Sequence, residues 1–133
     1  MDIADIKKEL ISLGWGEQTL ELAIRAKFKC EYCGTDILES VDSYYSIQVE
    51  HIIPKMKEGP DNSDNLAIVC KNCNFIKRNW DPRKMVPKEF QNRNSLLNVS
   101  KEYIQNKRAN KNKIVVRMKD LSVELMKGIK EVQ

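Results

Sequence analysis

The feature that most constrains this chain is its set of four cysteines, which fall into two pairs of identical spacing. The pairs are Cys30-x-x-Cys33 and Cys70-x-x-Cys73. In a secreted protein four cysteines can form two disulfides, whereas in an intracellular protein paired C-x-x-C motifs indicate a zinc site. We favour zinc. Because four thiolates complete a tetrahedron and leave no position open, such an ion is structural and stabilises a core too small to hold together alone.

The segment between the two cysteine pairs is expected to form a hairpin. Residues 44–53 are rich in β-branched and aromatic side chains, which is typical of a strand, and Pro54 follows them. Residues 66–69 form a second apolar run after a polar loop, and residues 71–79 are expected to be helical. This order of cysteine pair, hairpin, cysteine pair and helix is typical of a treble-clef zinc domain. The predicted fold class is therefore α+β, with a zinc-stapled ββα core.

Helical extensions are expected on both sides of this core. Asp2 can cap a first helix, and residues 17–28 have the spacing of a second. Residues 87–130 predict two further helices, separated by a break within residues 106–113. The last helix carries an apolar stripe that can pack on the N-terminal helices, which we favour, or close a homodimer or a larger complex. The stripe consists of Ile114, Met118, Leu121 and Leu125.

The chain is expected to be one compact domain with three parts. These are N-terminal helices (1–27), a core (28–80), and a basic linker with C-terminal helices (81–133). No stretch approaches the roughly 18 apolar residues of a membrane-spanning helix, and the acidic, amphipathic start does not resemble a signal peptide. We therefore expect no membrane association and a soluble, cytoplasmic protein.

Charge is distributed unevenly along the chain, whose net charge is +4. Five acidic residues and two lysines give residues 1–22 a charge of −3, whereas twelve basic and three acidic residues give residues 71–113 a charge of +9. A basic half on a near-neutral chain predicts a polyanionic partner such as DNA, although a solvated helical face has the same composition.

Three polar residues near the cysteine pairs are candidates for catalysis. His51 is the single histidine of the chain and follows Glu50. An imidazole with a pKa of about 6.5 can accept a proton from water at neutral pH. Glu50, and Asn74 directly after Cys73, offer the hard oxygen ligands that Mg²⁺ prefers. Neighbouring strand residues point to opposite faces, but at a strand end both Glu50 and His51 can border one site.

With these residues in place, the segment 49–78 (VEHIIPKMKEGPDNSDNLAIVCKNCNFIKR) resembles the core of an HNH endonuclease. The resemblance rests on Glu50-His51, on Asn65 before the second strand, on Asn74 in the helix, and on the flanking cysteine pairs. It covers roughly residues 28–80. Two positions depart from the commoner pattern, since Glu replaces Asp at 50 and Asn replaces His at 74, and the second change favours Mg²⁺ or Mn²⁺ over a softer ion.

The resemblance implies a metal-dependent DNA endonuclease. His51 would be the general base, Glu50 and Asn74 would bind the catalytic Mg²⁺ or Mn²⁺, and Asn65 would brace the loop that orients the histidine. The products would carry a 5′-phosphate and a 3′-hydroxyl. Among the pathways that use this motif, we prefer restriction or antiphage defence. The alternatives are a non-catalytic zinc-dependent DNA-binding module and a subunit of a larger nucleic-acid complex.

Basic residues directly after the predicted active-site helix are expected to contact DNA phosphates near the cut; their alternative role is that of a solvated loop. They are Lys77, Arg78, Arg83 and Lys84.

Overall fold

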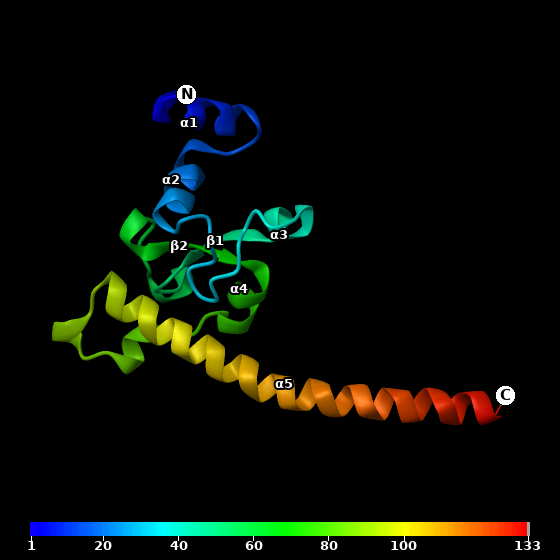
Figure 1. The fold of residues 1–133 in the computed structure, drawn as a ribbon. Coiled ribbons are helices and arrows are strands. Elements are labelled where there is room, and N and C mark those ends of the chain that lie inside the picture. Colours follow the sequence, from blue (N-terminus) through cyan, green and yellow to red (C-terminus); the bar gives the residue numbers. More distant parts are fainter. Residues whose placement is uncertain (133) are drawn as a thin grey trace.

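The computed structural model describes residues 1–132 and is built around a two-stranded antiparallel hairpin (Figure 1). Strand β1 (Ile47–His51) pairs with β2 (Leu66–Cys70) in a register that sets Ile47 against Cys70 and His51 against Leu66. Helix α4 (Lys71–Lys77) begins directly after β2, with the Cys70 side chain accepting a hydrogen bond from the backbone N–H of Cys73. The predicted α+β class and ββα core are confirmed.

The first predicted strand is shorter than expected because its start is helical. Ser40 caps a short helix, α3 (Val41–Tyr45), by accepting a hydrogen bond from the backbone N–H of Ser43 at 3.0 Å. A local cap therefore overrides the β propensity of the tyrosines, which was the basis for starting the strand at residue 44.

The N-terminal helices are α1 (Ile3–Ser12) and α2 (Glu17–Arg25). The Asp2 cap is confirmed, since its side chain accepts from the Asp5 N–H at 2.9 Å. Helix α2 ends three residues before the predicted boundary at 28, because Lys27 and Phe28 adopt φ angles of 58° and 56°. This left-handed turn directs the chain into the first cysteine pair.

Alternate side chains of β2 contribute to two hydrophobic clusters, one on each face of the hairpin. Leu66 and Ile68 pack with Trp15 and the buried residues of α2. Ala67 and Val69 pack with a cluster that includes Tyr32 and the first turns of α5 (Arg93–Val132). Four 3₁₀ turns, η1 (Lys55–Lys57), η2 (Ser63–Asn65), η3 (Pro82–Met85) and η4 (Lys88–Phe90), complete the described secondary structure. The hairpin thus lies between the N-terminal helices and α5.

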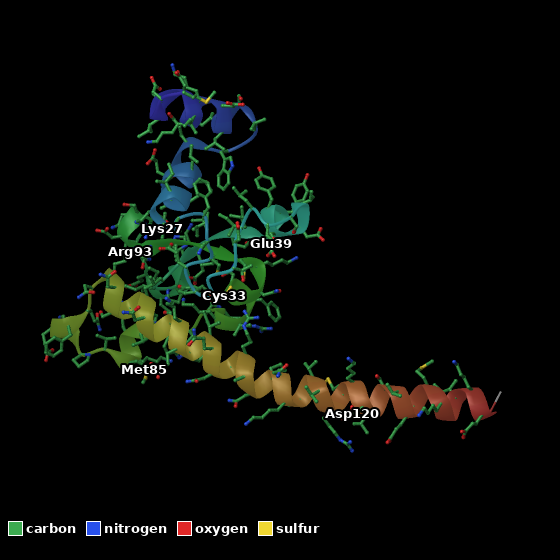
Figure 2. All side chains as sticks on the ribbon, viewed as in Figure 1. Lys27, Cys33, Glu39, Met85, Arg93 and Asp120 are labelled. Carbon is green, nitrogen blue, oxygen red and sulfur yellow. The ribbon has the colours of Figure 1, made fainter. Side chains whose placement is uncertain are left out.

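Residues 93–132 form a single helix of 40 residues, so the predicted break within 106–113 is wrong. That stretch contains no proline or glycine, and its lysine, arginine, alanine and asparagine residues are compatible with a helix interior. Leu96, Ser100 and Ile104 are buried at the start of α5. Arg93, labelled in Figure 2, anchors this end through an ion pair with Glu31 at 2.9 Å.

The outer part of α5 extends away from the rest of the molecule (Figure 1), and residues 105–131 are exposed. Side chains around Asp120 project into solvent (Figure 2). The predicted apolar stripe does not pack on the N-terminal helices, because α5 lies on the other side of the hairpin and, being continuous, carries the stripe away from the rest of the molecule (Figure 1). Its members are 46% to 63% exposed: Ile114, Met118, Leu121 and Leu125. Within residues 1–132 no helix combines the length and the apolar character needed to cross a membrane.

Candidate active site and zinc centre

The four cysteines converge at one end of the hairpin. Their sulfur atoms all lie within 4.8 Å of one another, and Sγ of Cys33 lies 3.7 Å from Sγ of Cys70. Four sulfurs at about 2.3 Å from a tetrahedral zinc ion lie about 3.8 Å apart, so this geometry fits zinc. Cys30 and Cys73 are buried, with exposed fractions of 2% and 0%. The predicted four-cysteine cluster is confirmed, and it is consistent with a structural zinc ion.

Without an ion, the surroundings of the cluster favour one thiolate and disfavour a second. Sγ of Cys30 accepts hydrogen bonds from the backbone N–H groups of Cys33 at 3.4 Å and Cys70 at 3.2 Å. Hydrogen bonds with Cys30, then with Cys73, lower the pKa of Cys70 to about 3, while those with Cys30 and Cys70 raise the pKa of Cys73. The second charge is disfavoured because the thiols share one small space, and a bound cation removes that conflict. Arg108 of α5 also donates to Sγ of Cys73, at 3.1 Å.

His51 lies at the opposite end of the hairpin, where β1 ends. Its Nε2 lies 2.5 Å from Oδ1 of Asp61, and its side chain is 23% exposed. The hydrogen bond with His51, followed by the charge of Lys55, lowers the pKa of Asp61, so Asp61 is a carboxylate that can only accept. In a neutral ring Nε2 therefore carries the proton, and Nδ1 retains the lone pair that can accept a proton from water.

Sequence reasoning missed Asp61. It lies ten positions after His51, in a loop whose composition indicates only a turn. One signal was available: a hairpin loop returns residues 52–65 to the end of the strand from which they started, so a carboxylate in that loop is a natural partner for the strand's last residue.

Asn65 ties this loop together through its side-chain amide. Its Oδ1 accepts from the N–H of Ile53 at 2.8 Å, and its Nδ2 donates to the carbonyls of Ile53 and Pro60, each at 3.0 Å. Gly59 makes a close approach in the same loop, where an added Cβ would lie 1.8 Å from the Ile53 carbonyl oxygen. Asn65 thus holds both ends of the loop that carries Asp61.

Glu50 faces the interior, on the opposite side of β1 from His51. It is 6% exposed, accepts a hydrogen bond from the phenol of Tyr32, and pairs with Nζ of Lys77 at 2.8 Å. Burial raises the pKa of Glu50, and the charge of Lys77 opposes that shift. Burial and the carboxylate of Glu50 also raise the pKa of Tyr32, so the phenol stays protonated and donates.

Lys77, which was predicted to contact DNA phosphates, has a fully buried side chain in this structure. Besides Glu50, its ammonium donates to the carbonyl oxygens of Ile52 at 2.9 Å and His51 at 3.4 Å. These three bonds fix the end of α4 to the end of β1. A phosphate could reach Lys77 only if this part of the core opened.

The assignment of a divalent ion to Glu50 and Asn74 does not fit this conformation. Each oxygen of the Glu50 carboxylate already has a donor, and one donor is an ammonium that would repel Mg²⁺. Asn74 is half-buried on α4. Within residues 1–132 the cysteine cluster is the one group of three or more His, Cys, Asp or Glu ligands close enough to share an ion.

The other three residues predicted to contact phosphates take no part in the buried Glu50–Lys77 ion pair. Arg78 is exposed, and its guanidinium lies 4.4 Å from the ring centre of Phe75. Arg83 pairs with Asp81 at 2.7 Å, so much of its charge is compensated. Lys84 is exposed. The two arginines therefore differ in what they can offer a phosphate.

These features lie in one continuous part of the chain. The family model for HNH endonucleases matches residues 30–79, which contain both cysteine pairs, the hairpin, His51 and α4. Residues 30–79 are therefore an HNH endonuclease domain. The chain matches no curated protein and no solved structure in the same comparisons.

Proposed function

We propose that this chain is a nuclease that hydrolyses phosphodiester bonds in DNA, with His51 as its general base. One observation carries the proposal. Within an HNH endonuclease domain, Nε2 of His51 is held by Asp61 at 2.5 Å, which orients the ring and leaves Nδ1 free to take a proton. The +9 charge of residues 71–113 supports a polyanionic substrate.

The chemistry requires an activated water. In the proposed reaction Nδ1 of His51 takes a proton from water as the water oxygen bonds to phosphorus. The bond from phosphorus to the 3′ oxygen breaks, and a proton returns to that oxygen. The products then carry a 5′-phosphate and a 3′-hydroxyl. A positioned general base contributes about 10²- to 10⁴-fold to such a step.

Hydrolysis also needs a cation to neutralise the phosphate as charge develops. HNH family membership suggests Mg²⁺ or Mn²⁺ in this role, and the sequence-based prediction assigns the ion to Glu50 and Asn74. Because Lys77 is the cation bound to Glu50 in this structure, we assign no step to such an ion. The requirement for a divalent ion remains a prediction and is tested directly.

The experiment incubates supercoiled plasmid with protein in Mg²⁺, in Mn²⁺ and in EDTA, alongside His51→Ala and the control Met56→Ala, an exposed uncharged position in the adjoining loop. We expect nicked or linear DNA from wild type and Met56→Ala, and none from His51→Ala. Zinc content is measured afterwards, because EDTA can also remove the ion needed for folding. Product end groups are read by ligation.

Two results would reject the proposal. Wild-type cleavage that survives in His51→Ala would exclude the general-base role. Tight DNA binding by folded, zinc-loaded protein without cleavage under any condition would favour the binding-only alternative. Cleavage that persists in EDTA, with zinc retained, would exclude the predicted divalent ion and keep His51.

A further inference from the structure

A groove between α4 and α5 lies outside the site built on His51. It encloses about 700 Å³ and is lined by Asn72 and Phe75 of α4, by Arg78 directly after α4, and by Lys107, Arg108 and Lys111 of α5, among others. Lys107 and Arg108 precede Lys111 by four and three positions, so all three border one side of the helix. The groove thus exists because α5 remains helical through residues 106–113.

The polar character of this groove is cationic. Four of its lining residues are basic and none is acidic. Within residues 1–132 none of these four side chains forms an ion pair with a carboxylate. Asp36 and Asp42 line a neighbouring cavity that shares Arg108 and Asn72, and so mark one border of the basic surface. Clustered cations without carboxylate partners repel one another, and a polyanion relieves that repulsion.

Aromatic rings hold two of the cations in place. The guanidinium of Arg78 lies over Phe75, and Nζ of Lys107 lies 5.4 Å from the ring centre of Tyr103. Tyr103 in turn stacks on Trp80, with ring centres 4.1 Å apart. A ring orients a cation without neutralising it. Phe75 is itself 66% exposed and offers a flat apolar face beside the charges.

Arg108 has a different role from the other three. Its guanidinium donates to Sγ of Cys73, so it connects α5 to the zinc centre. This bond fixes the α5 wall of the groove relative to α4, which carries Asn74 inside the HNH endonuclease domain. The spacing of the remaining cations across the groove is therefore set by the fold.

We propose that this groove binds the sugar–phosphate backbone of the DNA substrate, with Arg78, Lys107 and Lys111 contacting phosphates and Phe75 packing on a deoxyribose. The inference rests on the proposed function, which supplies DNA as the polyanion. It keeps Arg78 from the contacts predicted from the sequence and adds Lys107 and Lys111. Of the other predicted contacts, Lys77 is buried and Arg83 is paired with Asp81.

The test compares two triple variants that remove equal charge. Arg78→Gln/Lys107→Gln/Lys111→Gln alters the groove and spares Arg108, while Lys119→Gln/Lys127→Gln/Lys130→Gln alters the exposed outer part of α5. Binding of a fluorescent 30-base-pair duplex is measured by anisotropy without divalent ions, across a range of salt concentrations. Hydrolysis of bis(p-nitrophenyl) phosphate, a diester too small to span the groove, is measured in parallel. Circular dichroism and zinc content confirm folding.

We expect the groove variant to bind duplex DNA about 10- to 100-fold more weakly near 0.1 M salt. Its plot of log affinity against log salt should lose about 2 to 3 units of slope, since each phosphate contact contributes about 0.9. The outer variant should keep most of the affinity. Hydrolysis of the small diester should be equal in all three proteins.

Equal binding by wild type and the groove variant would overturn the inference, as would an equal loss in both variants. If no protein hydrolyses any diester, the proposed nuclease function fails, yet the anisotropy result still reports on the groove. The two failures are therefore distinguishable.

Discussion

The two ends of the hairpin perform different tasks with the same two strands. At one end, beside the Ile47–Cys70 pair, four converging thiols fit a zinc ion. At the other, beside the His51–Leu66 pair, the side-chain amide of Asn65 holds a loop through hydrogen bonds. Cys30 and Cys73 are buried at the cysteine end, although Cys33 is exposed, whereas the side chains of His51 and Asp61 are 23% and 71% exposed. Strong fixation at one end allows the other end to expose the polar groups that the proposed hydrolysis needs.

The largest expected effect follows from disrupting the four-cysteine cluster. Removing zinc with a strong chelator, or substituting Cys73→Ser, should unfold residues 30–79, because structural zinc contributes on the order of 10 kcal/mol to comparable small domains. Far-UV circular dichroism and proton release on re-addition of zinc would measure this. A fold that survived complete zinc loss would show that the hydrophobic clusters suffice, and the contrast between the two ends would disappear.

The next effect acts on the histidine end alone. His51→Ala should reduce DNA cleavage by about 10²- to 10⁴-fold, because it removes the proton acceptor. The thermal unfolding midpoint should change little, since the imidazole is not part of either hydrophobic cluster. A large drop in stability with unchanged cleavage would show that His51 stabilises the fold and does not act in cleavage.

Short-range sequence patterns indicated which residues lie at both ends of the hairpin. The spacing of Cys30–Cys33 and Cys70–Cys73 predicted that the two pairs meet, which limits the fold between them, and the four sulfur atoms do converge. His51 was identifiable because it is the single histidine and lies within the HNH pattern. In both cases the informative residues are close neighbours in sequence or belong to one motif.

The features that sequence reasoning missed depend on tertiary packing. Whether Lys77 faces solvent or Glu50 depends on how α4 sits on β1, which residue types alone do not specify. The continuity of α5 depended on a weak local preference, since asparagine and lysine in 106–113 neither stop a helix nor strongly favour one. The basic groove could not be inferred until that helix was known to be unbroken.

A third prediction concerns the buried ion pair between Lys77 and Glu50. Lys77→Met should destabilise the fold by about 3–5 kcal/mol, because it leaves the Glu50 carboxylate buried with Tyr32 as its remaining donor. Chemical denaturation at neutral pH measures the loss. Exposed Lys84→Met is the matched control and should be neutral.

The pH dependence of that variant tests the cause. Burial already raises the pKa of Glu50 above its ordinary value of 4.5, and removing Lys77 removes the largest opposing influence. A folded carboxyl with a raised pKa holds its proton more tightly than the unfolded one. The variant should therefore be most stable below about pH 4.5 and lose stability as pH rises through the raised pKa. Stability that increased over this range would exclude an unpaired buried carboxylate.

A smaller loss of stability should follow from removing the side-chain hydrogen bonds that hold the loop of residues 52–65. Asn65→Ala leaves the N–H of Ile53 without its side-chain partner and frees the carbonyls of Ile53 and Pro60. We expect a loss of about 1–3 kcal/mol, the usual cost of an unsatisfied part-buried group, together with faster hydrogen exchange in residues 52–65. Unchanged exchange in the loop would show that η2 and Gly59 fix it without Asn65.

The smallest expected effect comes from changing Asp61, which tests how far cleavage depends on the orientation of the His51 ring rather than on its presence. Asp61→Asn should reduce cleavage by about tenfold, well below the effect of His51→Ala, because an amide can still accept from Nε2 but can also present its NH₂ group. The hydrogen bond with His51 is the main cause that lowers the pKa of Asp61 below its ordinary value of 3.8. Asp61 therefore stays charged between pH 5 and 8. A decrease in cleavage as the pH falls through this range must come from another group. The Asp61→Asn profile should therefore keep an acid limb at reduced height. Loss of that limb would identify Asp61 as the titrating group and remove His51 from the role of base.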